Sequence, residues 1–128
     1  MIGTIGIIAI AAGGAVGAVA RYGISVGAVA LLGHGFPYGT LIVNVLGSFL
    51  MGLLIAKFAL AGVTQEVRLF AVTGFLGAFT TFSTFSLDVM TLWQRGDIWH
   101  AMLYMMASVI LSILALGLAL WLMKGSAL

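Results

Sequence analysis

The 128-residue sequence contains no cysteine, a single proline and only 6% charged residues. The absence of cysteine excludes disulfide bonds and thiolate metal sites. A net charge of +2 is too small to indicate a nucleic-acid partner. Soluble domains contain about a quarter charged residues. The low charge, together with 63% hydrophobic residues and a mean hydropathy of +1.29, therefore predicts an integral membrane protein.

Four apolar runs fill the chain, and each is long enough to supply the ~20 residues that a spanning helix needs. They predict four transmembrane helices, at about residues 2–32, 38–60, 67–92 and 98–123, with the third broken near 77–81. The first run has no basic residues before it and is too long for a leader, so it is interpreted as a retained helix. No polar tract could form a separate soluble domain, and residues 1–128 are predicted to be one membrane domain.

The distribution of basic residues gives little preference for one orientation in the membrane. With the N-terminus inside, Lys57, Arg68 and Lys124 lie inside, Arg95 lies outside, and Arg21 lies deep in the first helix. Such a weak bias is compatible with insertion in both orientations. Four helices also enclose a polar pathway poorly, and two-fold dimers are the commonest homo-oligomers. The expected fold is therefore an all-α protein of four transmembrane helices, for which an antiparallel, dual-topology homodimer is possible.

A polar and aromatic segment interrupts the third apolar run, after Gly74 and Gly77. It consists of Thr80, Thr81, Phe82, Ser83, Thr84, Phe85 and Ser86. Irregular backbone at membrane depth is tolerated only where it is buried in protein or lines a cavity. This segment is predicted to be the working part of the chain.

Further polar side chains are spaced so that they share helix faces. Asn44 lies one turn before Ser48, and Tyr104, Ser108 and Ser112 follow one another at intervals of four residues. Any one of them could simply join neighbouring helices by a hydrogen bond. Together with the 80–86 segment, the line in the fourth run favours a lined pathway.

The chemistry of these groups indicates a small anion. Hydroxyls and an amide donate hydrogen bonds, and the rings of Phe82 and Phe85 carry positive edges. No ring of carboxylates is present to attract cations, and Arg21 would raise the local anion concentration. The residues by themselves do not name the anion.

Other functions fit less well. The sequence has no HExxH, GxSxG or phosphate-binding motif, so we expect no enzyme. A small four-helix proton-coupled exporter would need a carboxylate inside the membrane; Asp88 is the one candidate, and a solvated charge at a helix end is its simpler interpretation. A non-transporting assembly subunit would leave the 80–86 segment without a purpose.

The chain resembles the Fluc (CrcB) family of fluoride channels. The resemblance covers its whole length, and the segment 73–86 is its most specific part. The other matching stretches are 13–18 leading to Arg21 and Tyr22, 39–41 leading to Asn44 and Gly47, and the line Tyr104, Ser108, Ser112.

The resemblance implies an antiparallel homodimer with two pores. It would carry fluoride passively out of a prokaryotic cell through the cytoplasmic membrane and so give fluoride resistance. An inside-negative potential suffices, since it drives an anion outward with ~2.3 kcal/mol per 100 mV. The residues expected along the fluoride pathway are Phe82, Phe85, Asn44, Ser83, Thr84, Tyr104, Ser108 and Ser112. Arg21 would line a vestibule.

The resemblance also implies a structural sodium ion at the dimer interface. The backbone carbonyls of Gly77 and Thr80, from both subunits, would bind it. Hard cations prefer oxygen ligands, and a helix break frees carbonyls for that use. The expected partners are therefore fluoride, sodium, membrane lipid and a second copy of the chain.

Overall fold

A computed structural model describes residues 3–126, and all the regular secondary structure in these residues is helical. The elements are α1 (Thr4–Leu32), α2 (Tyr38–Ala61), α3 (Gln65–Arg68), the π-helical segment η1 (Leu69–Leu76), α4 (Gly77–Phe79), α5 (Phe82–Gln94) and α6 (Ile98–Ser126). Within the described part, four spans are long and apolar enough to cross a membrane: Thr4–Leu32, Tyr38–Ala61, Gln65–Gln94 and Ile98–Gly125. This confirms the expected four-helix membrane protein. Residue 2, the predicted start of the first helix, lies outside the described residues.

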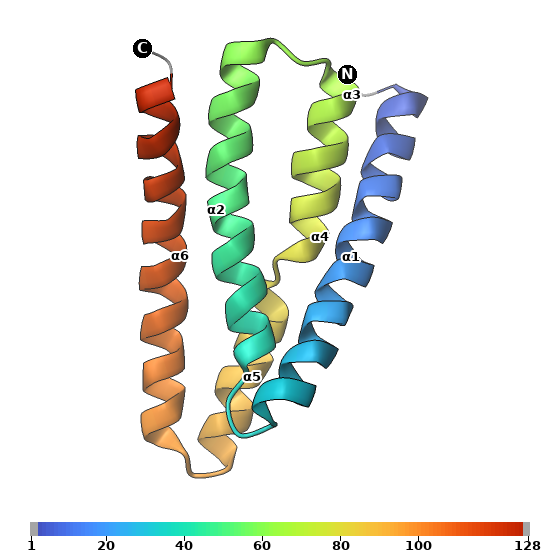
Figure 1. Ribbon diagram of the computed structural model, residues 1–128. Helices are drawn as coiled ribbons and strands as arrows, with labels where there is room; N and C mark the ends of the chain where they lie inside the picture. Colours follow the sequence, from blue (N-terminus) through green and yellow to red (C-terminus); the bar gives the residue numbers. More distant parts are fainter. Residues whose placement is uncertain (1–2, 127–128) are drawn as a thin grey trace.

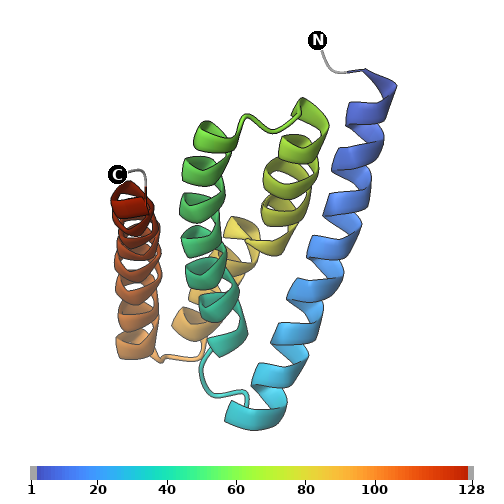
Figure 2. The same cartoon turned by 45° about the horizontal axis from the view of Figure 1, so that its top comes forward.

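The third span is assembled from α3, η1, α4 and α5, and it changes direction between α4 and α5 (Figure 1). It starts at Gln65, earlier than predicted, because Thr64 caps it by accepting a hydrogen bond from the amide of Val67 at 3.3 Å. Viewed from two directions, α2 lies in the middle, with α6 on one side and α1 on the other (Figures 1 and 2). The most extensive contacts join α2 to α6 and α1 to η1.

Two small clusters of buried side chains form the interior. One contains Val43, Leu76 and Phe79, and the other contains Leu92, Ala101 and Tyr104. Most other large hydrophobic side chains are exposed, including the three tryptophans. Lipid is the natural solvent for such a surface, so a small interior is expected. Tryptophans near helix ends are typical of the membrane–water interface.

Glycines let α1 lie directly against the backbone of the third span. A Cβ atom at Gly13 would collide with the carbonyl oxygen of Phe70, and one at Gly17 would collide with that of Phe75. The π-helical segment η1 occupies this contact. Gly23 and Gly27 have the same spacing but open space around them within the chain. The pair Gly13 and Gly17 therefore packs within the described chain, whereas the pair Gly23 and Gly27 does not.

We expect Gly17→Ala to destabilise the protein and Gly23→Ala to leave it as stable or slightly more stable. The added methyl at position 17 must displace backbone, and overpacking of this kind typically costs about 1–3 kcal/mol. The methyl at position 23 meets no other atom within 4 Å of the chain. Thermal unfolding of the two variants in detergent measures the difference. Equal melting temperatures would show that the tight contact at Gly17 is absent.

Candidate functional site

The third span loses its helical conformation at two residues, Thr80 and Thr81. Their backbones are extended, with φ −87° and ψ 157° at Thr80 and φ −153° and ψ 118° at Thr81. The sequence predicts a break near 77–81. The structure retains helix through Phe79, so the break occupies the end of that range.

Asn44 of α2 bridges the break with its side-chain amide. Its Nδ2 donates to the carbonyl oxygen of Thr81 at 3.1 Å, and its Oδ1 accepts from the amide of Thr81 at 2.8 Å. One side chain therefore satisfies both backbone groups of a residue that helix bonds no longer serve. Unsatisfied backbone groups are costly in a membrane, so this pair of bonds stabilises the break.

Thr81 also starts the next helix. Its hydroxyl accepts a hydrogen bond from the amide of Thr84 at 3.1 Å and lies 3.4 Å from the Ser83 hydroxyl. A threonine that caps a helix in this way is a frequent N-terminal signal. Two residues expected along the pathway, Ser83 and Thr84, thus lie in the capped first turn of α5.

Arg21 is hydrogen-bonded to α4, on the N-terminal side of the break. Its Nε donates to the carbonyl oxygen of Ala78 at 2.9 Å. In a continuous helix that carbonyl would accept from the amide of Phe82. Arg21 lies one turn beyond Gly17 on α1, so the same face of α1 that contacts η1 also reaches the end of α4. The expected vestibule role of Arg21 stays a prediction.

The carbonyls of Gly77 and Thr80 lose their helical partners at this break. In a continuous helix, the amide of Thr81 would donate to Gly77 and the amide of Thr84 would donate to Thr80. The first amide donates to Asn44 and the second to the Thr81 hydroxyl instead. Two carbonyl oxygens, which are ligands of the type that hard cations prefer, are thereby left available. These two carbonyl oxygens are suitable ligands for the expected sodium ion.

A groove of about 440 Å³ runs along α2, the break and α6. It is lined in part by Asn44, Phe82, Phe85, Ser108 and Ser112, all of them residues predicted from the sequence. Among the described residues, the Ser108 hydroxyl is a buried side-chain group without a hydrogen-bond partner. None of the described residues that line the groove is acidic. The groove therefore offers hydrogen-bond donors and ring edges but no negative charge.

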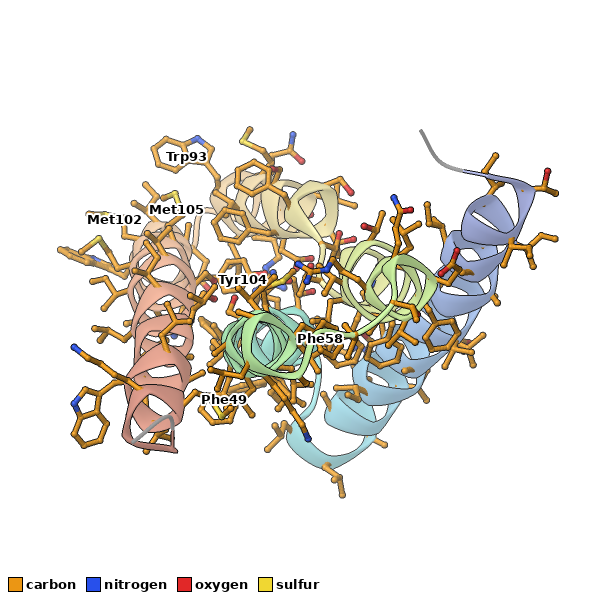
Figure 3. All side chains as sticks on the ribbon, turned by 90° about the horizontal axis from the view of Figure 1, so that it is seen from above. Phe49, Phe58, Trp93, Met102, Tyr104 and Met105 are labelled. Carbon is orange, nitrogen blue, oxygen red and sulfur yellow. The ribbon has the colours of Figure 1, made fainter. Side chains whose placement is uncertain are left out.

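Tyr104 is fully buried and packs against Phe85, which lines the groove. Its ring centroid is 5.2 Å from that of Phe85, which is 5.5 Å from that of Phe82. Seen from above, Tyr104 points from α6 into the space between the helices, whereas Trp93 points outward (Figure 3). The Tyr104 hydroxyl donates to Asp88 at 2.9 Å. Asp88 is therefore not simply a solvated charge.

Sequence reasoning gave no role in the site to two residues of α2. Gly47 lies against the break, where a Cβ atom would collide with the side chain of Thr80. Thr40 is buried and lines a second cavity, of about 220 Å³, beside Asp88. Gly47 could have been found as a glycine inside an apolar helix, which often marks close backbone approach. No comparable signal exists for Thr40.

Charged groups hold the chain together at the end of the molecule nearest this second cavity. Arg95 donates to the carbonyl oxygen of Gly35 at 3.0 Å and lies 3.6 Å from the carboxylate of Asp97. Asp97 is hydrogen-bonded to His100 at 2.7 Å, and that bond holds the pKa of Asp97 below its usual value. These contacts attach the 33–37 loop to the turn between α5 and α6.

The sequence matches a known protein family. The family model described as "CrcB-like protein, Camphor Resistance (CrcB)" matches residues 8–120. The chain belongs to the CrcB family. This confirms the resemblance seen in the sequence. Membership and the four spanning helices make it a multi-pass protein of a prokaryotic cytoplasmic membrane.

Curated relatives match over nearly their whole lengths. A fluoride-specific ion channel FluC from Mesorhizobium japonicum is 52% identical over 112 residues, which are 88% of this chain and 90% of the relative. The FluC of Agrobacterium fabrum is 50% identical over 119 residues, 91% and 95% of the two chains. That of Roseobacter denitrificans is 46% identical over 121 residues, 93% and 95%.

Proposed function

We propose that the chain forms a fluoride-selective channel that lets fluoride leave the cytoplasm passively and so gives fluoride resistance. The observation that carries this proposal is the groove of hydrogen-bond donors and phenylalanine edges that contains no acidic residue. The names of the relatives, which are fluoride-specific ion channels, support the choice of anion. We attribute no catalytic reaction to the chain, because no base lies beside a nucleophile in the groove.

Each lining group has a task in moving a small anion. Fluoride entering a narrow path loses its water and needs replacement donors. The Ser108 hydroxyl is buried without a partner and faces this path. The edges of Phe82 and Phe85 present partial positive charge without binding the ion as strongly as a full charge. Weak, successive contacts let an ion enter and also leave.

We also propose that two copies pair as an antiparallel homodimer. Phe82 is 78% exposed in the single chain, and Ser83 beside it is exposed as well. Lipid chains cannot satisfy the polar groups of the groove, so another protein surface must cover them. The weak charge asymmetry favours a second copy in the opposite orientation.

A structural sodium ion at the dimer interface is the third part of the proposal. The carbonyl oxygens of Gly77 and Thr80 would hold it, because their usual helical donors bond to other groups. The cation would offset the partial negative charge at the carbonyl end of α4 in both subunits. Arg21 bonds the neighbouring carbonyl of Ala78 and keeps the same turn in place.

Fluoride efflux from liposomes tests the function. Vesicles loaded with potassium fluoride and treated with valinomycin should release fluoride rapidly, as measured by a fluoride electrode, and chloride-loaded vesicles should release no chloride. Phe82→Leu and Phe85→Leu should each reduce the fluoride rate about tenfold, corresponding to about 1.4 kcal/mol of lost ion stabilisation.

Phe49→Leu is the matched control, because Phe49 lines a separate apolar groove between α2 and α6. Its efflux rate should equal that of the unmodified chain. If the unmodified chain is folded and dimeric but releases no fluoride, the channel proposal is wrong.

The lack of cysteine makes the proposed dual topology simple to measure. Single cysteines would be introduced as Thr64→Cys, between α2 and α3, and His34→Cys, at the opposite end of the molecule. A membrane-impermeant maleimide applied to intact cells should label about half of the molecules at each position, as two oppositely inserted copies per dimer require. Complete labelling at one position and none at the other would contradict the antiparallel dimer.

Sodium should stabilise the purified protein. Replacing sodium chloride by N-methylglucamine chloride at constant ionic strength should lower the melting temperature, since a ligand at 100 times its Kd adds about 2.7 kcal/mol of stability. Asn44→Ala should abolish the response. Without Asn44, the Thr81 amide can donate to the Gly77 carbonyl, which is then no longer available to sodium. Ser48→Ala, one turn further along α2, should retain it. Equal melting of the unmodified chain in both salts would refute the sodium site.

A further inference from the structure

Tyr104 packs against lining residues of two hollow regions of the molecule. On one side its ring contacts Phe85, which lines the 440 Å³ groove, with 5.2 Å between centroids. On the other side, its ring lies 5.5 Å from that of Phe36, which lines the 220 Å³ cavity. The ring of Tyr104 therefore lies between a residue of the groove and a residue of the cavity.

The hydroxyl of Tyr104 is already engaged. It donates its single proton to Oδ2 of Asp88, whose carboxylate lines the cavity. Asp88 lies in α5, two turns beyond the break, and is half-buried. The carboxylate is thus an anion of the protein itself, bound to the last donor of the line Ser112, Ser108, Tyr104.

Among the described residues, neither basic side chain that lines the cavity is hydrogen-bonded to Asp88. Arg95, the residue after α5, lines the same cavity, but its guanidinium bonds the carbonyl of Gly35 and pairs with Asp97. His34 of the 33–37 loop also lines the cavity and is exposed. Tyr104 is thus the partner to which the Asp88 carboxylate is directly hydrogen-bonded.

A hydroxyl with one proton cannot donate it to two acceptors at full strength. An anion arriving at Tyr104 competes with Asp88 for that proton and is also repelled by the carboxylate charge at close range. Both effects raise the energy of the ion at this position. Both disappear when the carboxylate is removed or turned away.

We propose that Asp88 is a positioning residue that closes this end of the pathway by holding the hydroxyl of Tyr104, and that fluoride passes when it displaces the carboxylate. The inference rests on the proposed channel function and adds a regulating residue to the same path. Asp88 acts through Tyr104, and the 220 Å³ cavity is the chamber by which fluoride reaches or leaves that end of the groove.

The test is fluoride efflux from liposomes containing the full chain, with a double-mutant cycle. Asp88→Asn and Asp88→Ala should each raise the fluoride rate about threefold or more, as removal of a nearby like charge predicts. In a Tyr104→Phe background, the same changes should raise the rate by a clearly smaller factor, because no hydroxyl remains to be released. Using two substitutions at position 88 keeps the test available if one variant fails to fold.

Glu66→Gln is the matched control, since it removes an exposed carboxylate at the opposite end of the molecule and should leave the rate unchanged. If the unmodified chain conducts fluoride but both Asp88 variants are unchanged or slower, the inference is wrong and the channel function stands. An equal factor in the two backgrounds would show that Asp88 acts by charge alone and would overturn its role through Tyr104. An unmodified chain that conducts nothing would overturn both the channel and this inference.

Discussion

The hydrogen bonds between the Asn44 side chain and the Thr81 backbone are the interaction on which the rest of the site depends. A break in a membrane helix exposes amides and carbonyls that lipid cannot bond. A carboxamide offers a donor and an acceptor side by side, so it can serve both groups of one extended residue, as Asn44 does. Because the Thr81 amide bonds to Asn44, the carbonyl of Gly77 loses its helical donor, and α5 can start after Thr81, which caps it.

Close backbone approach is the second condition for this geometry. Gly47 leaves the space that the side chain of Thr80 fills, and Gly17 lets α1 touch the backbone at Phe75. One turn after Gly17, Arg21 reaches the carbonyl of Ala78. The break is consequently held from α1 on one side and from α2 on the other. A segment held in this way can keep its polar groups in fixed positions without its own helix bonds, and fixed donors are what selective recognition of a small ion requires.

Much of this arrangement follows from the sequence, and the remainder shows where sequence reasoning ends. Apolar run length predicts the four spans, and the hydroxyl-rich segment after Gly77 predicts a break. The spacing of Ser108 and Ser112 places both in the groove. The sequence could not show that Thr81 bonds Asn44, that Arg21 bonds Ala78 or that Asp88 bonds Tyr104, because these pairs join different helices. Their geometry depends on how the helices pack, which local periodicity does not determine.

The open groove is the reason for proposing that a single chain needs a second copy. Phe82 is 78% exposed in the single chain. Its ring edge can stabilise an anion only in a path that excludes lipid. Acyl chains could cover the ring but could not hydrogen-bond Ser83 or line an ionic path. In the proposed antiparallel pair, a second copy covers the groove of the first, and its own groove is covered in return. A two-fold axis then produces two pathways together, so the number of pathways follows from the symmetry by which each groove is closed.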